Sequence, residues 1–169
     1  MSLHDDLREQ ARHLCSKEPR RPKQASLRRA VSSAYYALFH KLVFEATHRF
    51  IRLADRAELR QCLGRAFGHA DMKDVSVQFA KGTVSPKLSA GLKGRQVQPE
   101  LRRIAVAFVD LQQARHEADY DSARLFRRRE VVSLIDEAEQ SFADWQAVRE
   151  SPQADTYLLA LLAQRQMRL

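Results

Sequence analysis

The most constraining feature of this sequence is the stretch from Gln24 to Arg52, which contains neither glycine nor proline. Apolar residues recur there every three to four positions, as they do along one face of a helix. The first stripe consists of Leu27, Val31, Ala34, Leu38 and Leu42, and Tyr35, Phe39 and Val43 widen it. A helix that is apolar around so much of its circumference belongs at the centre of a helical bundle.

The rest of the chain also favours helices. Its 169 residues include five glycines and five prolines, about 6% together against a usual ~12%, which argues against turn-rich sandwiches and barrels. Apolar periodicity predicts helices over 2–17, 24–52, 54–67, Met72 to about Gly82, Pro99 to about His116, 131–145 and from Pro152 onward. We therefore expect one domain over 1–169, an all-α, up-and-down bundle with short connecting helices and an extra C-terminal helix over 152–169.

One segment, 82–99, has a different composition. It holds three of the five glycines, two prolines and no acidic residue. Such a composition predicts a long, mobile, basic loop.

The charge of the chain favours a polyanionic partner. Lysine and arginine number 29 against 21 acidic residues, a formal net charge of +8. The stretch from Pro19 to Phe44 has no acid and contains six basic residues, namely Arg20, Arg21, Lys23, Arg28, Arg29 and Lys41. Stretches of this kind suit sequence-independent contacts with nucleic-acid phosphates. The alternative is a surface that is charged only for solubility.

Polar side chains also follow the central helix beside its apolar stripe. Spacings of four, three and four residues place on one face Arg29, Ser33, Tyr36 and His40. On the helix predicted from Pro99, the buried face continues to Arg115. A half-buried arginine needs a carboxylate or phosphate that accepts from its planar fork of donors. That acceptor is Asp119, four residues on, an acid elsewhere in the chain, or an external phosphate.

Two segments carry a resemblance to a known family. Residues 28–41 read RRAVSSAYYALFHK and residues 115–121 read RHEADYD, with His69 and the FAKG of 79–82 between them. Together they resemble the HEPN superfamily, the small helical nucleotide-binding domains of higher eukaryotes and prokaryotes, over residues 24–142. The resemblance implies a bundle of four or five helices, commonly a homodimer. Many members are metal-independent ribonucleases, often toxins paired with nucleotidyltransferase-like antitoxins, or defence effectors.

The chain departs from the catalytic signature of those nucleases, an arginine followed four to six residues later by a histidine. Beyond the adjacent His116 there is no later histidine, and Asp119 or Tyr120 occupies the expected place. His116 is rotated by about 100° from Arg115 around the helix, so the two do not share a face.

Two versions of an RNA- or nucleotide-binding function remain open. Metal-independent cleavage requires a base and a fixed cation beside the reacting phosphate. The residues predicted for catalysis are His40 as the base, Arg115 as the cation, and Tyr120 or Tyr36 as a hydroxyl donor. Binding of phosphate without turnover fits equally well, and the residues predicted for it are Arg29, Ser33, Tyr36, His116 and Asp119, with Arg115.

Other function classes lack their motifs. No CxxC, HxxH or HExxH predicts a metal site, and no GxxxxGK[ST], GxGxxG or GxSxG predicts a nucleotide cofactor or a hydrolase elbow. The longest apolar run has seven residues, 157–163, whereas a membrane span needs about 20. With two cysteines and no apolar leader at the N-terminus, we expect a cytoplasmic protein with reduced thiols.

Two alternatives to an RNA-binding domain stay open. The first is a non-catalytic interaction module, because the last helix carries too many leucines for one face, namely Leu158, Leu159, Leu161 and Leu162. The second is a DNA-binding helix-turn-helix over 59–83, although its recognition helix, 71–80, would carry one lysine and two acids.

Overall fold

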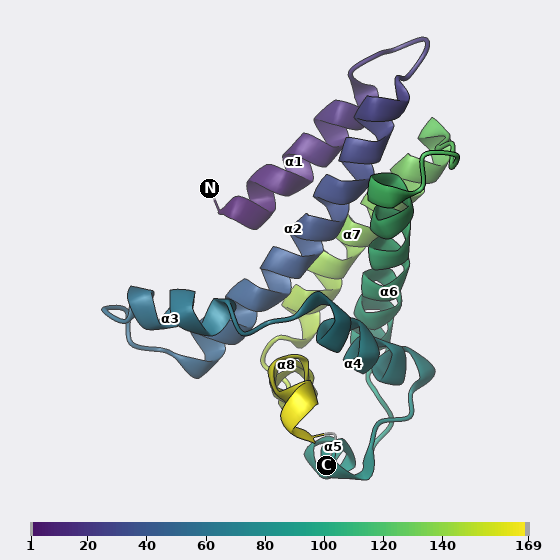
Figure 1. The fold of residues 1–169 in the computed structure, drawn as a ribbon. Helices are drawn as coiled ribbons and strands as arrows, with labels where there is room; N and C mark the ends of the chain where they lie inside the picture. The colour runs from purple at the N-terminus through teal and green to yellow at the C-terminus, as the bar shows by residue number, and fades with distance from the viewer. Residues whose placement is uncertain (1, 168–169) are drawn as a thin grey trace. The chain divides into compact units, whose positions relative to one another are not determined.

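The computed structural model describes residues 2–167, and these form helices joined by turns, without a strand. The helices are α1 (Leu3–Ser16), α2 (Gln24–Phe50), α3 (Ala57–Gly64), α4 (His69–Lys81), α5 (Pro86–Leu92), α6 (Pro99–Tyr120), α7 (Arg128–Val148) and α8 (Pro152–Met167) (Figure 1). The predicted all-α helical bundle is confirmed. Among the described residues, no helix combines the length and the apolar character that crossing a bilayer requires.

The chain forms two compact units. Unit 1 contains residues 1–40 and 107–143, and unit 2 contains residues 41–106 and 144–169. Unit 1 therefore holds α1, the first part of α2, the second part of α6 and most of α7. Unit 2 holds α3, α4, α5 and α8 with the remaining parts of α2, α6 and α7.

Unit 1 is a four-helix bundle in which a short turn joins α1 to α2 and another joins α6 to α7. The predicted stripe of α2 is its core, since Leu27, Val31 and Leu38 are buried. The rings of Tyr35 on α2 and Phe108 on α6 lie 5.6 Å apart. At the surface, Arg12 of α1 donates to Glu139 of α7. Apolar packing at the centre and side-chain pairs at the rim thus join all four helices.

Unit 2 is built around α8, which packs on α4 and α5. Tyr157 of α8 is fully buried, its ring lies 4.7 Å from that of Phe79, and its hydroxyl is 2.9 Å from Ser76 Oγ. This hydrogen bond gives the buried Tyr157 hydroxyl a partner, while Ser76 also donates to the carbonyl of Met72 at 2.8 Å. α5 approaches α8 closely, because a Cβ at Gly91 would lie 2.5 Å from Thr156 Oγ1.

Two sequence predictions about unit 2 are wrong in part. The helix expected over 54–67 is shorter in the structure: α3 ends at Gly64, and the extended Gly68 is the N-cap of α4. The loop expected over 82–99 contains the helix α5. Pro86 opens α5 at its first turn, where proline costs no hydrogen bond. Burial of Leu88 and Leu92 in unit 2 then stabilises a helix that a glycine-containing segment would not form alone.

Candidate functional site

Arg115 lies near the C-terminal end of α6 and points toward α2. Its side chain is 18% exposed, and its Nη2 donates to the Tyr36 hydroxyl at 2.8 Å. Its Nε lies 2.8 Å from Asp119 Oδ2, although the Nε–H is not aligned for a hydrogen bond to that oxygen. The ion pair with Asp119, one of the alternatives that the sequence left open, is therefore present. Nη1 forms no hydrogen bond with any described residue, so the guanidinium keeps an unused donor.

Three tyrosine rings surround this guanidinium. Its central carbon lies 5.4 Å from the ring centroid of Tyr36, 5.9 Å from that of Tyr35 and 5.7 Å from that of Tyr120. These distances fall within the range of cation–π attraction. Burial alone would lower the pKa of Arg115, but the Tyr36 oxygen and the Asp119 carboxylate outweigh it, and the pKa is raised. The guanidinium therefore stays protonated, although the carboxylate of Asp119 offsets its charge.

Tyr120 and His116 form an exposed aromatic pair beside Arg115. Tyr120 is 68% exposed, and its ring centroid lies 5.0 Å from that of His116. Both side chains line a shallow groove of about 640 Å³ together with Gln113, Glu117, Asp121 and Arg124. An exposed ring next to a fixed cation is an arrangement on which a nucleobase stacks while its phosphate is neutralised.

Only part of the face of α2 that the sequence predicted meets α6: Tyr36 bonds Arg115, whereas Arg29 and Ser33 do not. Arg29 is exposed, and Ser33 donates to Gln10 of α1 rather than facing Arg115. Ser32, which lies four residues before Tyr36 on the neighbouring stripe of α2, donates to Asp119 Oδ1 of α6 at 2.7 Å. Sequence reasoning thus missed Ser32, although its spacing of four from Tyr36 was available as a signal.

Arg28, predicted only as one of the basic residues of 19–44, has a structural role that sequence reasoning missed. Its guanidinium donates to backbone carbonyls at the end of α6 and in the following turn, including those of Ala118 at 2.8 Å and Asp121 at 2.9 Å. The last carbonyls of a helix have no partner within the helix. Arg28 satisfies them and places a cation at the negative end of the helix dipole. It thereby fixes the segment that carries Asp119 and Tyr120.

His40 lies next to this centre but does not bond to Arg115. Its ring stacks on that of Tyr36 with centroids 6.2 Å apart and meets Phe39 edge-on at 5.2 Å. Burial lowers the pKa of His40 below its ordinary value. Tyr36 therefore contacts both residues, accepting from Arg115 through its hydroxyl and stacking on His40 through its ring. His40 is a neutral imidazole at neutral pH, as a general base must be.

The lowered pKa of His40 predicts how stability depends on pH. Because the unfolded chain binds a proton at this imidazole more readily than the folded chain does, stability falls as pH drops below about 6.5. The variant His40→Gln is expected to lose less stability than the wild type between about pH 7.5 and pH 5. Urea unfolding at both pH values measures the difference, and an unchanged pH slope in the variant would contradict the burial assigned to His40.

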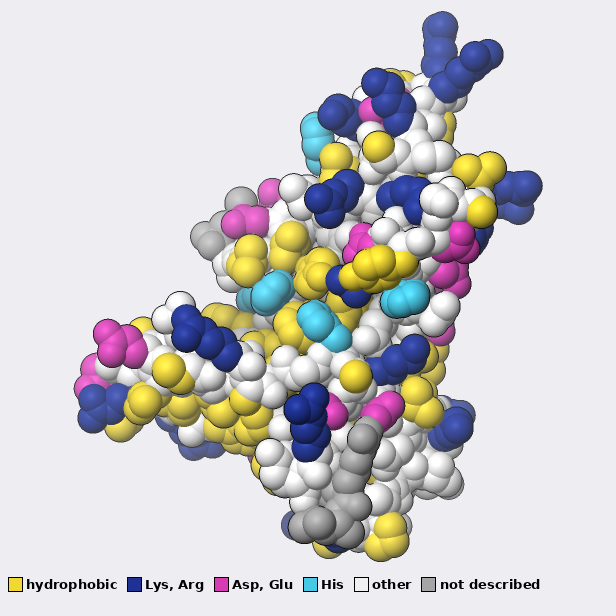
Figure 2. All heavy atoms as spheres, in the orientation of Figure 1, with side chains coloured by type: hydrophobic (Ala, Val, Ile, Leu, Met, Phe, Trp, Pro, Cys, Tyr) yellow, Lys and Arg dark blue, Asp and Glu magenta, His cyan; other side chains and the backbone are white. Residues whose placement is uncertain are grey.

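The predicted basic stretch 19–44 does not form one surface. Lys41 is buried with its ammonium 2.7 Å from Glu45 Oε1, and Arg28 is directed at the α6 carbonyls. Figure 2 shows Lys and Arg side chains mixed with acidic ones on the visible face, and several of them at the end of unit 1 where the two interhelical turns lie.

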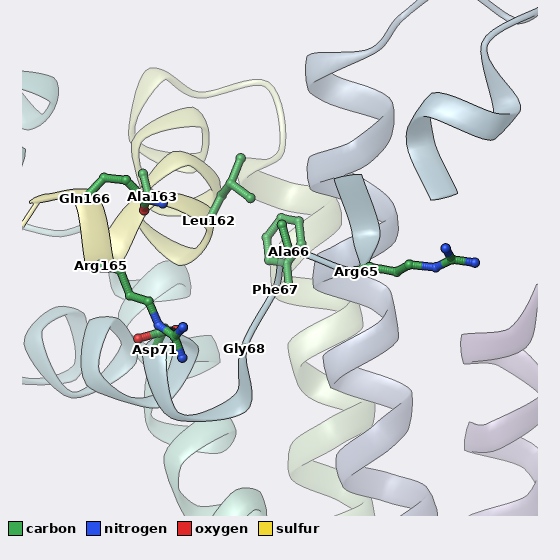
Figure 3. Close-up of a pocket in the computed structure, with 9 residues that line it drawn as sticks. All are labelled: Arg65, Ala66, Phe67, Gly68, Asp71, Leu162, Ala163, Arg165 and Gln166. Atoms are coloured by element: carbon green, nitrogen blue, oxygen red, sulfur yellow. Dashed lines mark ion pairs between the residues drawn. The ribbon is translucent and has the colours of Figure 1, made fainter. Parts of the chain in front are cut away.

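A second large cavity has a different character. It measures about 480 Å³ in unit 2, between the segment before α4 and the end of α8 (Figure 3). Phe67, Leu162 and Ala163 line it, and Arg165 Nε lies 2.8 Å from Asp71 Oδ2 at its edge. That ion pair already occupies the one carboxylate of the cavity. None of the residues predicted for catalysis or phosphate binding lines it.

Metal ligation finds no support among residues 2–167, which contain no group of three or more histidine, cysteine, aspartate or glutamate side chains arranged to hold an ion. No model of a known protein family matches the chain, and neither does any curated protein or solved structure.

Proposed function

We propose that this chain binds single-stranded RNA, or a nucleotide, through phosphate contacts at Arg115. The observation that carries the proposal is the unused Nη1 donor of a fixed guanidinium beside the exposed Tyr120–His116 ring pair. Arginine recognises phosphate through parallel donors, and aromatic rings stack bases of any sequence. The HEPN resemblance of residues 28–41 and 115–121 agrees with this role.

Metal-independent cleavage of the bound RNA is the enzymatic version of this proposal. It is favoured by the neutral imidazole of His40, whose ring stacks on the tyrosine that is hydrogen-bonded to Arg115. In this version His40 takes the proton of a ribose 2′-hydroxyl, and Arg115 stabilises the charge that develops on the phosphate. Tyr36 or Tyr120 would supply a hydroxyl donor.

The test measures both RNA retention and RNA cleavage in EDTA. Arg115→Ala is expected to weaken RNA binding at least about tenfold, since a hydrogen bond to a charged group contributes roughly 1.5–3 kcal/mol. Arg95→Ala, which removes an exposed cation of unit 2, is the matched control and is expected to bind as the wild type does. Circular dichroism confirms that each variant is folded.

The outcomes separate the versions. Cleavage that disappears in both Arg115→Ala and His40→Ala supports the ribonuclease. Salt-sensitive retention without cleavage supports a binding protein. If the wild type neither binds nor cleaves RNA, the proposal fails.

A second candidate, a protein-interaction module, is favoured by exposed apolar residues in unit 2. α3 has no buried residue, and Leu53 and Leu59 are 63% and 53% exposed. Leu159 of α8 is also exposed. Large exposed apolar side chains of this kind mark contact surfaces when they lie close together. An absence of RNA binding would favour this candidate.

The cellular location, the oligomeric state and the protein partner are also proposals. Following the HEPN resemblance, we propose a homodimer with a nucleotidyltransferase-like antitoxin as partner. From the cysteine content and the N-terminal residues, we propose a cytoplasmic location. The free thiols of Cys15 and Cys62 suit a reducing compartment. The exposed Leu159 supports a contact between copies.

A further inference from the structure

Exposed Lys and Arg side chains gather at the end of unit 1 where its two interhelical turns lie (Figures 1 and 2). We call them the basic end: Lys17, Arg20, Arg21 and Lys23 from the α1–α2 turn, and Arg127 and Arg129 from the α6–α7 turn and the start of α7. Within residues 2–167, none of these six side chains forms a hydrogen bond or an ion pair, whereas the neighbouring Arg124 and Arg128 do.

Side chains fix the two turns to each other. Arg128 donates to the carbonyl oxygens of Pro19, at 2.7 Å, and of Glu18. Gln24 both donates to the carbonyl of Phe126, at 2.8 Å, and accepts from its backbone N–H, at 2.9 Å. The six cations are therefore presented by a held framework, although they come from segments about 100 residues apart in the chain. Less ordering is needed when a ligand binds to a surface that is already in place.

The nearby acids do not neutralise this charge. Glu130 is paired with Arg124. Glu18 accepts from Ser26 Oγ at 2.9 Å and from the Lys23 backbone N–H. Glu18 also interacts electrostatically with Lys17 and Lys23. The other four cations of the basic end are arginines, whose forked donors match phosphate oxygens.

Arg115 together with Tyr36, Asp119, Tyr120 and His116 is called here the Arg115 centre, and the basic end belongs to the same unit. Tyr36 lies twelve residues along α2 from Gln24, about 18 Å at 1.5 Å per residue. Arg29, exposed and without a partner among the described residues, lies between them on α2. Tyr120 is the last residue of α6, and Arg127 is the last residue of the interhelical turn that follows it. A single strand that stacks a base on Tyr120 therefore has cations within reach along its backbone.

We propose that the basic end binds the phosphate backbone of single-stranded RNA, independently of sequence, and extends the Arg115 centre into a longer RNA-binding tract. This inference rests on the proposed function, and it names a second, separate contact surface. RNA is favoured over an anionic membrane because the tract leads to an exposed aromatic pair, which supplies the stacking that a bilayer does not use.

The test uses the full chain and a single-stranded RNA of about 12 nucleotides. Fluorescence anisotropy measures affinity between about 50 and 200 mM salt. The basic-end variant combines Arg20→Gln, Arg21→Gln, Arg127→Gln and Arg129→Gln. The matched control combines Arg52→Gln, Arg65→Gln, Lys81→Gln and Arg95→Gln, which are exposed cations of unit 2. Both variants lose the same net charge.

The basic-end variant is expected to bind at least about tenfold more weakly, and its log–log salt slope to fall by about 3, because each lost phosphate contact removes roughly 0.7 from the slope on a single strand. The control is expected to change affinity less than about twofold. An equal loss in both variants would overturn the inference, since net charge alone would then explain binding.

The remaining outcomes separate the two proposals. If Arg115→Ala weakens binding while the basic-end variant binds as the wild type does, the basic end has no role and the proposed function survives. If the wild type binds no RNA, both proposals fail. Binding to phosphatidylserine vesicles but not to RNA would assign the basic end to a membrane surface.

Discussion

Replacing Arg28 by alanine is expected to lower the free energy of unfolding by about 2–3 kcal/mol, because carbonyls at the end of α6 and in the following turn lose their shared donor. Hydrogen bonds from a charged donor are stronger than neutral ones. The loss corresponds to a fall in melting temperature of roughly 4–12 °C for a chain of this size. Thermal unfolding followed by circular dichroism measures it.

The adjacent arginine supplies the control. Arg29→Ala removes the same groups one position along α2, where the side chain is exposed and forms no hydrogen bond within residues 2–167. We expect its effect to stay within about 0.5 kcal/mol. Arg28→Lys should recover part of the loss, because an ammonium cannot span carbonyls as widely as a guanidinium fork does. Equal effects of Arg28→Ala and Arg29→Ala would show that the α6 carbonyls do not depend on Arg28.

This pair of residues also explains where sequence reasoning stopped. The apolar periodicity of 24–52 predicted which side of α2 is buried, and Leu27, Val31 and Leu38 confirm it. It could not predict which polar stripe meets α6, because adjacent residues such as Arg28 and Arg29 have the same chemistry and differ only by about 100° of rotation. That choice is made by packing between helices, which no local pattern contains.

The Arg115 centre could be predicted only in part, since local patterns indicate residues on one helix but not their partners on another. The break in the buried face of α6 indicated Arg115, and the spacing of four indicated Asp119; both appear in one ion pair. Tyr36 was also predicted, from its helical spacing to Ser33 and His40, and in the structure its hydroxyl accepts from Arg115. Ser32 and Arg28 were missed, since their partners lie 87 to 90 residues away in the sequence.

The helix α5 of unit 2 was predicted as a loop, because the contacts that stabilise it come from other helices. The segment of α5 has a composition typical of loops, with Gly91 inside the helix. Its helical state depends on burying Leu88 and Leu92, and its glycine allows the backbone to approach Thr156 of α8. Composition alone gives no access to either contact.

The second large effect is expected from the buried ion pair of unit 2. Lys41 Nζ lies 2.7 Å from Glu45 Oε1, and the two side chains are 8% and 7% exposed. Burial alone would raise the pKa of Glu45, but Lys41 and neighbouring donors outweigh it, and the pKa is lowered. Glu45→Ala is expected to cost about 3 kcal/mol, because a buried ammonium loses the carboxylate that neutralises it. Urea unfolding measures the change.

The two partners should not be equivalent. Glu45 also lies 3.5 Å from Arg149 Nη2 through its second oxygen, so Lys41→Met leaves the carboxylate with a second cation and is expected to cost less than Glu45→Ala. The double variant Lys41→Met, Glu45→Leu removes both charges and keeps apolar volume, and it should regain most of the loss. A double variant as unstable as Glu45→Ala would contradict the electrostatic explanation, because the loss would then come from packing rather than from a stranded charge.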